Sequence, residues 1–234
     1  YREKRTRARM KFLVADWGWQ RFRDVLEEKM GYALEHDETL DGPVHAPHTD
    51  HMGSGPQKQP GLNYLGIPIE RGRVSSAQMK LVADLAERYA APGKAQIRLS
   101  NKQNYILANI PTENLEPLTK ALTDGGLSPH ASLWRTSLIS CTGTQFCNLA
   151  IVETKKRAER ILKYLEDECA LDSPIMLSVT GCPNSCAQYQ IADIGLMGVV
   201  CNYREVRGTE AYNILLGGAL GADPKFATLA LKKV

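Results

Sequence analysis

Apolar residues follow helical spacing at the start of the chain and then lose any regular spacing. They recur at every third or fourth position from residue 10 to Gly18 and from residue 22 to Gly31, which predicts two short helices that each end at a glycine. The segment 35–60 is polar and rich in Gly, Pro and His, with no sustained period. We therefore expect a helical segment over residues 1–34 and a linker over residues 35–60.

Residues 61–127 alternate between strand and helical spacing. The predicted strands are 62–69, 97–99 and 105–110, and the predicted helices are 76–91 and 115–124. Ser75 or Ser76 is placed to cap the first of these helices, and Gly125 follows the second. The order β-α-β-β-α is that of a ferredoxin-like half-domain that lacks one strand.

Residues 128–234 predict a mixed α/β domain. The expected strands are 137–140, 176–179, 194–200 and 212–216, and the expected helices are 148–168, a short one after Cys186, and 224–233. Helix 148–168 is amphipathic and would pack behind the loop that precedes it. The predicted fold class is therefore α+β, a ferredoxin-like half-domain followed by this mixed α/β domain.

Composition and charge exclude several classes of partner. With 43% hydrophobic and 24% charged residues, the 234-residue chain has the composition of a globular protein with a sizeable core. A formal net charge of +3 gives no argument for nucleic-acid binding. No stretch approaches the roughly twenty apolar residues of a membrane-spanning helix, and no apolar run follows the basic start, as a signal peptide would require. We expect neither a nucleic-acid partner nor a membrane partner.

Four of the six cysteines form two pairs in the second half of the chain. Cys141 and Cys147 are six residues apart, so a helix would turn their sulfurs to different faces; we expect a loop in which Gly143 takes a positive φ. Cys182 and Cys186 follow a predicted strand. A helix that starts at Pro183 would place both on one side, with its N-terminus stabilising the thiolates.

The spacing of the cysteines leaves more than one chemistry open. Four thiolates are the usual ligand set of a 4Fe–4S cluster. A structural zinc site also uses four cysteines, usually in pairs two to four residues apart, and disulfides would need an oxidising compartment. The remaining two, Cys169 and Cys201, are read as small buried hydrophobic residues.

The residues around these cysteines resemble a known family. Cys141-Thr-Gly-Thr-Gln-Phe-Cys147-Asn-Leu-Ala, Thr180-Gly-Cys182-Pro-Asn-Ser-Cys186-Ala-Gln and Ile191-Ala-Asp-Ile-Gly195 closely resemble the signature of the sirohaem-containing nitrite and sulfite reductases. The resemblance implies that Cys141, Cys147, Cys182 and Cys186 ligate a 4Fe–4S cluster. It also implies that Cys186 bridges the cluster to the iron of a sirohaem. Residues 128–234 would then be the sirohaem and 4Fe–4S domain, and residues 1–34 the helical tail of a preceding domain.

The same resemblance extends to further residues that would bind the cofactors. They are Arg98, Gln103, Asn104, Thr142, Asn184, Gly217 and Gly218. Arg98 to Asn104 is similar to an Arg-Leu-Thr-x-x-Gln-Asn element that occurs in each half of these reductases. Arg98 suits a bidentate grip on a macrocycle carboxylate, and an equally open alternative is that this segment only holds its own hairpin together.

The function that the resemblance implies is assimilatory reduction of a small oxyanion. The wording of both cysteine motifs looks closer to the nitrite reductase branch, so we favour six-electron reduction of nitrite to ammonia with electrons from ferredoxin or a similar one-electron donor. Reduction of sulfite to sulfide, a stand-alone 4Fe–4S electron-transfer module and a zinc-stabilised domain are the alternatives.

The resemblance matches only the second half of such an enzyme. The Arg and Lys residues that hold the substrate in the family lie mainly in the first half, so no catalytic residue is assigned and the chain alone would lack part of the active site. An N-terminal half or a second chain would complete it. The expected location is the cytoplasm, or the plastid stroma for a plant or algal parent.

Overall fold

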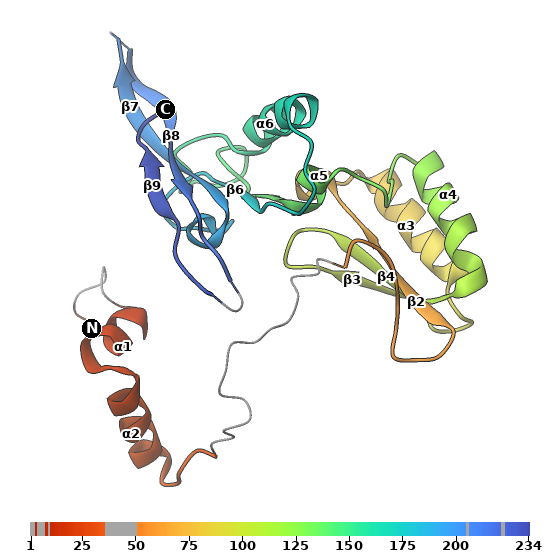
Figure 1. Ribbon diagram of the computed structural model, residues 1–234, viewed down its shortest axis with the longest axis horizontal. Helices are drawn as coiled ribbons and strands as arrows, with labels where there is room; N and C mark the ends of the chain where they lie inside the picture. The colour runs from red at the N-terminus through yellow and green to blue at the C-terminus, as the bar shows by residue number, and fades with distance from the viewer. Residues whose placement is uncertain (1–2, 4–7, 9, 36–50, 205, 221–222) are drawn as a thin grey trace. The chain divides into compact units, whose positions relative to one another are not determined.

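The structure is a computed structural model that describes residues 3, 8, 10–35, 51–204, 206–220 and 223–234 (Figure 1). Most of the predicted linker, residues 36–50, and part of the predicted N-terminal segment lie outside the described residues. The chain divides into two units, Tyr1–Pro43 and Val44–Val234. Each unit is considered by itself.

The first unit contains the two predicted helices. Helix α1 is Met10–Trp17 and helix α2 is Trp19–Met30. Gly18 lies between them with a φ of 78°, and Gly31 ends α2 in the left-handed conformation, with its N–H 2.9 Å from the carbonyl oxygen of Glu27. Glycine adopts these positive φ values without a steric penalty, so both predicted helix ends are confirmed.

The second unit begins with a four-stranded antiparallel sheet. Its strands are β1 (Gly53–Pro56), β2 (Leu62–Ile67), β3 (Gln96–Leu99) and β4 (Tyr105–Pro111), in the order β1-β2-β4-β3. The expectation of a lacking strand was wrong, because β1 supplies it from the segment read as linker. The Gly-Ser-Gly-Pro sequence of β1 has no apolar alternation to reveal it. Its close pairing depends on Gly66 of β2, where a Cβ would overlap the backbone of His51.

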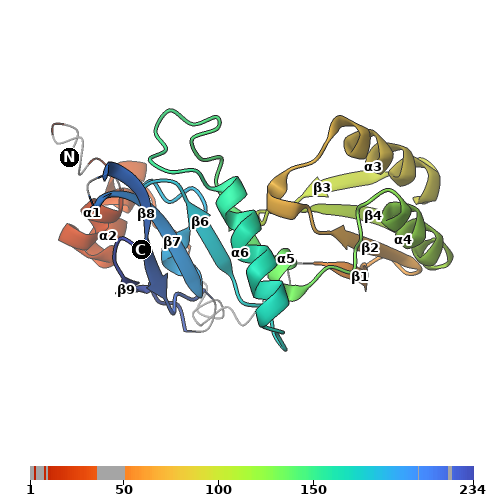
Figure 2. The same cartoon turned by 90° about the horizontal axis from the view of Figure 1, so that it is seen from above.

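Two helices cover one face of this sheet, α3 (Ser76–Tyr89) and α4 (Leu115–Asp124), as Figure 2 shows. Ser75 caps α3 through a reciprocal pair of hydrogen bonds with Gln78, the arrangement known as a capping box. The core between helices and sheet is apolar and consists of Leu65, Ile67, Ile69, Val82, Leu85, Ala86, Ala90, Leu107, Ile110, Leu118, Leu122 and Leu127. Two 3₁₀ turns, Glu70–Gly72 and Thr112–Asn114, connect these elements.

A five-stranded mixed sheet follows. Its strands are β5 (Leu138–Ser140), β6 (Leu177–Thr180), β7 (Ile194–Tyr203), β8 (Val206–Leu216) and β9 (Thr228–Leu231), in sequential order. The pairs β5–β6 and β6–β7 are parallel, and the other two pairs are antiparallel. Helices α5 (Leu133–Ser137) and α6 (Lys155–Glu168) belong to the same part, and α6 packs Ala158 and Leu162 onto a core with Leu177 and Val179.

Three expected helices of this part differ from the structure. Residues 228–231 form strand β9 at the edge of β8, because their backbone pairs with residues 214–216. After Cys186 there is only the 3₁₀ turn Tyr189–Ile191. Helix α6 begins at Lys155 instead of residue 148, because the preceding backbone hydrogen-bonds to Gly181 instead.

The predicted α+β fold with two sheets is confirmed by these elements. Among the described residues, no helix has the length and apolar character needed to cross a bilayer.

The core of the first sheet gives a stability prediction. Leu107 is fully buried between the sheet and both helices, so Leu107→Ala should lower the free energy of unfolding by about 2–5 kcal/mol. Chemical denaturation of the purified protein measures this. The control is Leu99→Ala on the neighbouring strand, whose residue is 76% exposed, with an expected change within about 0.5 kcal/mol. Equal losses in both variants would contradict this packing.

Candidate metal centre

The parallel pairing of β5 with β6 brings the two cysteine pairs together. Cys141 directly follows β5, and Gly181 and Cys182 directly follow β6. The N–H of Cys141 donates to the carbonyl oxygen of Val179 at 3.0 Å, which extends the parallel pairing past the end of β5. Since the carboxyl ends of parallel strands meet at one edge of a sheet, both loops start side by side.

The first loop turns back on itself at Gly143. Its φ is 68°, and its carbonyl oxygen accepts a hydrogen bond from the N–H of Cys147 at 3.0 Å. A Cβ at this glycine would lie 2.5 Å from Oγ1 of Thr154, so only glycine fits. Thr154 in turn donates its hydroxyl to the carbonyl oxygen of Cys141 at 2.6 Å. The expected loop with a positive φ at Gly143 is confirmed.

The second loop is not the expected helix. Residues 183–187 form turns, with Ser185 at a φ of 61° and its carbonyl oxygen accepting from the N–H of Gln188 at 2.8 Å. A left-handed residue at this position interrupts a right-handed helix, so Pro183 does not begin one. Thiolate stabilisation by a helix N-terminus is therefore wrong here. Instead, the N–H of Gly181 donates to the sulfur of Cys141 at 3.1 Å.

The Cys186 thiol lies within electrostatic range of the other three cysteines of the two pairs. Burial raises the pKa of the Cys186 thiol, and the neighbouring Cys141, Cys182 and Cys147 thiols raise it further. Like charges act this way only over short distances. Within the described part of the chain, no three Cys, His, Asp or Glu side chains are close enough together to hold a single metal ion. A tetrahedral zinc ion with Zn–S bonds of about 2.3 Å would need sulfurs only about 4 Å apart.

The residues present fit a polynuclear cluster bound by sulfur. The four cysteines lie on two loops that leave one edge of the sheet, Gly143 lets the first loop turn, and a backbone N–H already points at one of the sulfurs. Cys182 is buried, Cys141 and Cys147 are partly buried, and Cys186 is exposed. Among the four cysteines, Cys182 is therefore shielded from solvent and Cys186 is accessible to it.

Comparison with known proteins identifies the family. Residues 55–125 match the model of the nitrite/sulfite reductase ferredoxin-like half domain, and residues 135–234 match that of the nitrite and sulphite reductase 4Fe–4S domain. The chain belongs to the nitrite and sulfite reductase family. Members of this reductase family are oxidoreductases that contain a 4Fe–4S cluster and a sirohaem.

Relatives named as sulfite reductases and relatives named as nitrite reductases are both similar to this chain. Sulfite reductase [ferredoxin] 2 of Mycolicibacterium paratuberculosis is 40% identical over 97% of the chain and 41% of its own length. The chloroplastic ferredoxin–nitrite reductase of Zea mays is 36% identical over 100% of the chain and 41% of its own length. The structure of the Mycobacterium tuberculosis NirA protein matches with a TM-score of 0.89 and 37% identity, over 99% of the chain and 42% of that protein. The chain thus spans about two fifths of the length of the relatives it matches.

Of the other residues that the reductase resemblance singles out, Arg98 lies on β3, and Gln103 and Asn104 lie in the turn between β3 and β4. Arg98 is exposed and donates to the side chain of Gln96 at 3.2 Å. Asn104 is buried and accepts from the N–H of Ile69 at 2.8 Å, while its Nδ2 has no hydrogen-bond partner among the described residues. The side chain of Gln103 extends to the five-stranded sheet, where its Nε2 donates to the carbonyl oxygen of Ser140 on β5 at 2.9 Å. The hairpin therefore contacts the residue that precedes Cys141.

The remaining four of these residues lie on loops. Thr142 and Asn184 are exposed on the two cysteine loops, and Gly217 is exposed at the end of β8. Gly218 is buried, and a Cβ there would lie 2.6 Å from the carbonyl oxygen of Ala192. Gly218 also lines a cavity of about 390 Å³ together with Lys102. Its lack of a side chain allows a close approach of two backbone segments.

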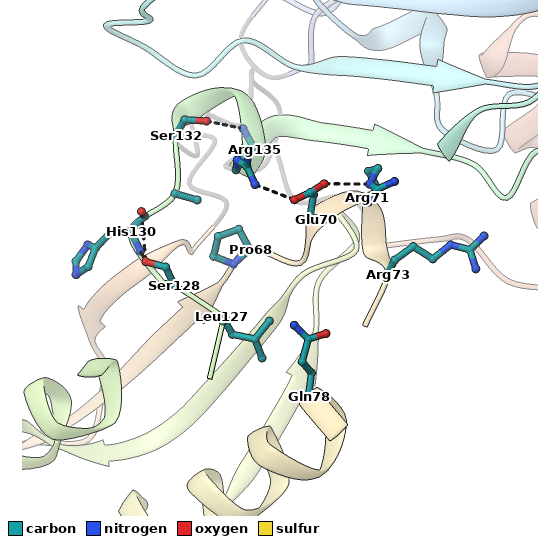
Figure 3. A pocket seen from close by; sticks show the side chains of 12 residues that line it. Pro68, Glu70, Arg71, Arg73, Gln78, Leu127, Ser128, His130, Ser132 and Arg135 are labelled. Carbon is teal, nitrogen blue, oxygen red and sulfur yellow. Dashed lines mark hydrogen bonds and ion pairs between the residues drawn. The ribbon is translucent and has the colours of Figure 1, made fainter. Parts of the chain in front are cut away.

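A second cavity, of about 440 Å³, lies where the ferredoxin-like half-domain meets the cluster domain (Figure 3). Arg135 of α5 crosses this junction: its guanidinium lies 2.7 Å from a carboxylate oxygen of Glu70 and 2.8 Å from one of Glu166. Arg71 forms two further ion pairs: its guanidinium lies 3.2 Å from a carboxylate oxygen of Glu70 and 2.8 Å from one of Glu159. The charges around this cavity are thus largely paired with one another, and they join the two domains.

Sequence reasoning missed Lys155, which lies at the first position of α6 and is only 7% exposed. Burial lowers its pKa to about 8, and the nearby charge of Arg73 lowers it further, while Cys141 acts in the opposite direction. No sequence signal separates it from Lys156 beside it, since both lie inside the helix expected over residues 148–168.

The turn at Gly143 gives a test of the first loop. Gly143→Ala combines an unfavourable positive φ with a contact to Thr154, so the variant should bind less iron and sulfide per chain than the parent, by about half or more, given a strain of order 1–3 kcal/mol. Thr144→Ala, at an exposed position of the same loop, is the control and should keep full content. Elemental and acid-labile sulfide analysis measures both. Full content in Gly143→Ala would show that the loop tolerates a side chain there.

The Arg135–Glu166 pair gives a pH prediction. Hydrogen bonds from Arg135 hold the pKa of the Glu166 carboxyl below its ordinary value of 4.5. A lowered folded-state pKa adds stability above the unfolded pKa, and this contribution is lost as pH falls through the folded pKa. Glu166→Gln should therefore lower Tm near neutral pH, with a difference that shrinks below about pH 4. Tm measured across this pH range tests it, and a difference that is constant with pH contradicts it.

Proposed function

We propose that this chain carries the cluster-binding half of a ferredoxin-dependent sirohaem reductase. The observation that carries the proposal is the parallel register of β5 and β6, which starts both cysteine loops at one edge of the sheet. Cys141, Cys147, Cys182 and Cys186 are the four cluster ligands. Each contributes one thiolate, the ligand type that iron–sulfur clusters require.

Cys186 would be the ligand shared with the sirohaem iron. It is exposed, whereas Cys182 is buried and the other two thiols are partly buried, so its sulfur has an open side available for a second metal. Thr142 and Asn184, both exposed beside the ligands, would face the macrocycle on this open side. Arg98, Gln103, Asn104, Gly217 and Gly218 would complete the contacts of this chain with the cofactors.

When bound, the cluster and the sirohaem supply one-electron transfer and an iron site for a small oxyanion. The protein positions these groups. The N–H of Gly181 donates to the Cys141 sulfur, and donation to a thiolate stabilises its charged form. Cys182 is held out of water, while Cys186 keeps contact with the open side.

The substrate that we propose is nitrite, reduced to ammonia in an assimilatory role with ferredoxin or a similar donor. The support comes from the residues of the two cysteine motifs, which are Thr-Gly-Thr-Gln-Phe between the first pair of cysteines and Asn-Ser before Cys186. Sulfite is the second candidate, favoured by the 40% identical mycobacterial relative that is named a sulfite reductase. The cations that grip the oxyanion would come from residues outside this sequence, in the same polypeptide or in a second chain. The cytoplasm or the plastid stroma is the compartment in which we place the protein.

The ligand assignment is tested by single substitutions. Cys186→Ser should reduce both the iron content and the visible absorption of the macrocycle, because one residue serves both cofactors. Cys201→Ser is the matched control, since Cys201 lies on β7 outside the cluster loops. It should leave iron content and spectrum unchanged. Loss of iron or of the visible absorption in Cys201→Ser, or an unaltered spectrum in Cys186→Ser, contradicts the assignment.

The choice of substrate is tested by turnover. The intact protein, supplied with reduced ferredoxin or a reduced viologen, should show a kcat/KM for nitrite at least about tenfold above that for sulfite, a difference of about 1.4 kcal/mol in transition-state stabilisation. The reverse ratio assigns the protein to the sulfite branch.

A further inference from the structure

Lys155 makes contacts that no surface lysine would make. Its Nζ lies 2.7 Å from the carbonyl oxygen of Ser140 and 3.3 Å from Oε1 of Gln103, and it also donates to the carbonyl oxygen of Arg71. These three acceptors come from three separate segments of the chain. An ammonium group has three N–H donors and no acceptor, so its whole hydrogen-bonding capacity is used.

The contacts explain how a lysine can be buried at this position. A charged group removed from water is stable only if it is fully hydrogen-bonded or paired. The acceptors around Nζ include two backbone carbonyls, which a neutral aliphatic side chain would leave without this donor. The three surrounding acceptors, and not helix propensity, therefore explain the lysine at the first position of α6.

The Ser140 peptide is held from both domains. Its carbonyl oxygen accepts from Lys155 of the cluster domain and, at 2.9 Å, from Nε2 of Gln103 of the ferredoxin-like half-domain. Gln103 has a φ of 65°, an uncommon conformation that directs the side chain of this turn residue across the junction. The next residue after Ser140 is Cys141. Any displacement of this peptide would move the Cys141 sulfur.

We propose that Lys155 is a positioning residue of the cluster site, which fixes the Ser140 peptide before Cys141 and keeps a positive charge beside the cluster thiolates. This inference rests on the ligand set proposed above. It assigns to Lys155 two separable effects, one on geometry through the hydrogen bonds and one on the cluster's reduction potential through the charge.

Charges of both signs surround Lys155. Arg71 and Arg73 add positive charge on the half-domain side, and Cys141 and Glu153 add negative charge on the other. A cluster with four thiolate ligands brings further negative charge to the side of Cys141. Lys155 therefore lies between two arginines that disfavour its charge and the Cys141 side that favours it, so removal of its charge takes one positive charge away from the thiolate side.

The test compares three variants of the intact cofactor-loaded protein. Lys155→Met removes charge and donors, Lys155→Arg keeps the charge, and Glu159→Gln removes an ion pair of the same junction without contact to Ser140. The readouts are the cluster midpoint potential, from an EPR-monitored redox titration, and the half-life of its visible absorption in the presence of an iron chelator. Lys155→Met should shift the potential to a more negative value and shorten the half-life severalfold. Lys155→Arg should keep the potential, and Glu159→Gln should keep both.

Two outcomes would overturn the inference. One is a folded Lys155→Met protein with the parent's potential and chelator half-life. If Lys155→Met does not accumulate as folded protein, Gln103→Leu decides, because it removes one donor to Ser140 and leaves the charge. The inference then requires a shorter half-life, and an unchanged half-life overturns it. A parent protein that binds no iron and sulfide would instead refute the proposed function itself.

Discussion

The register between β5 and β6 is the constraint on which the rest of the site depends. Ser140 pairs with Val179, and the two strands are parallel, so the residues that follow them leave the sheet at the same edge. The loops of Cys141 and Cys182 therefore start side by side. The N–H of Gly181, 40 positions after Cys141 in the sequence, donates to the Cys141 sulfur. A shift of one residue in either strand would move one of the cysteines to the opposite face.

The ferredoxin-like half-domain contributes to this site through the junction between the domains. Gln103 donates to the Ser140 carbonyl, Lys155 contacts the Arg71 carbonyl, and Arg135 joins Glu70 to Glu166. These contacts are polar and directional, so they specify an orientation as well as a separation. The partly exposed ion pairs alone would contribute little stability. Their effect is to place the β3–β4 hairpin against the end of strand β5, directly before Cys141, the first proposed cluster ligand.

The sequence predicts the chemistry of this chain better than its local geometry. The cysteine motifs and the turn at Gly143 follow from residue types with few alternatives, and the family membership agrees with them. Strand β1 was missed because Gly-Ser-Gly-Pro shows no alternation, and its strand state comes from pairing with Gly66. The helix expected at Pro183 was wrong because Ser185 is left-handed. Lys155 was missed because its burial depends on three acceptors that are distant in sequence.

The central claim is that four sulfurs from two loops surround one iron–sulfur cluster. Anomalous diffraction at the iron absorption edge, from crystals of the anaerobically purified protein, tests it most directly. The account predicts a compact group of four iron peaks bounded by the sulfurs of Cys141, Cys147, Cys182 and Cys186, with one further iron next to Cys186. A single metal peak among these cysteines, or iron located away from them, would contradict it.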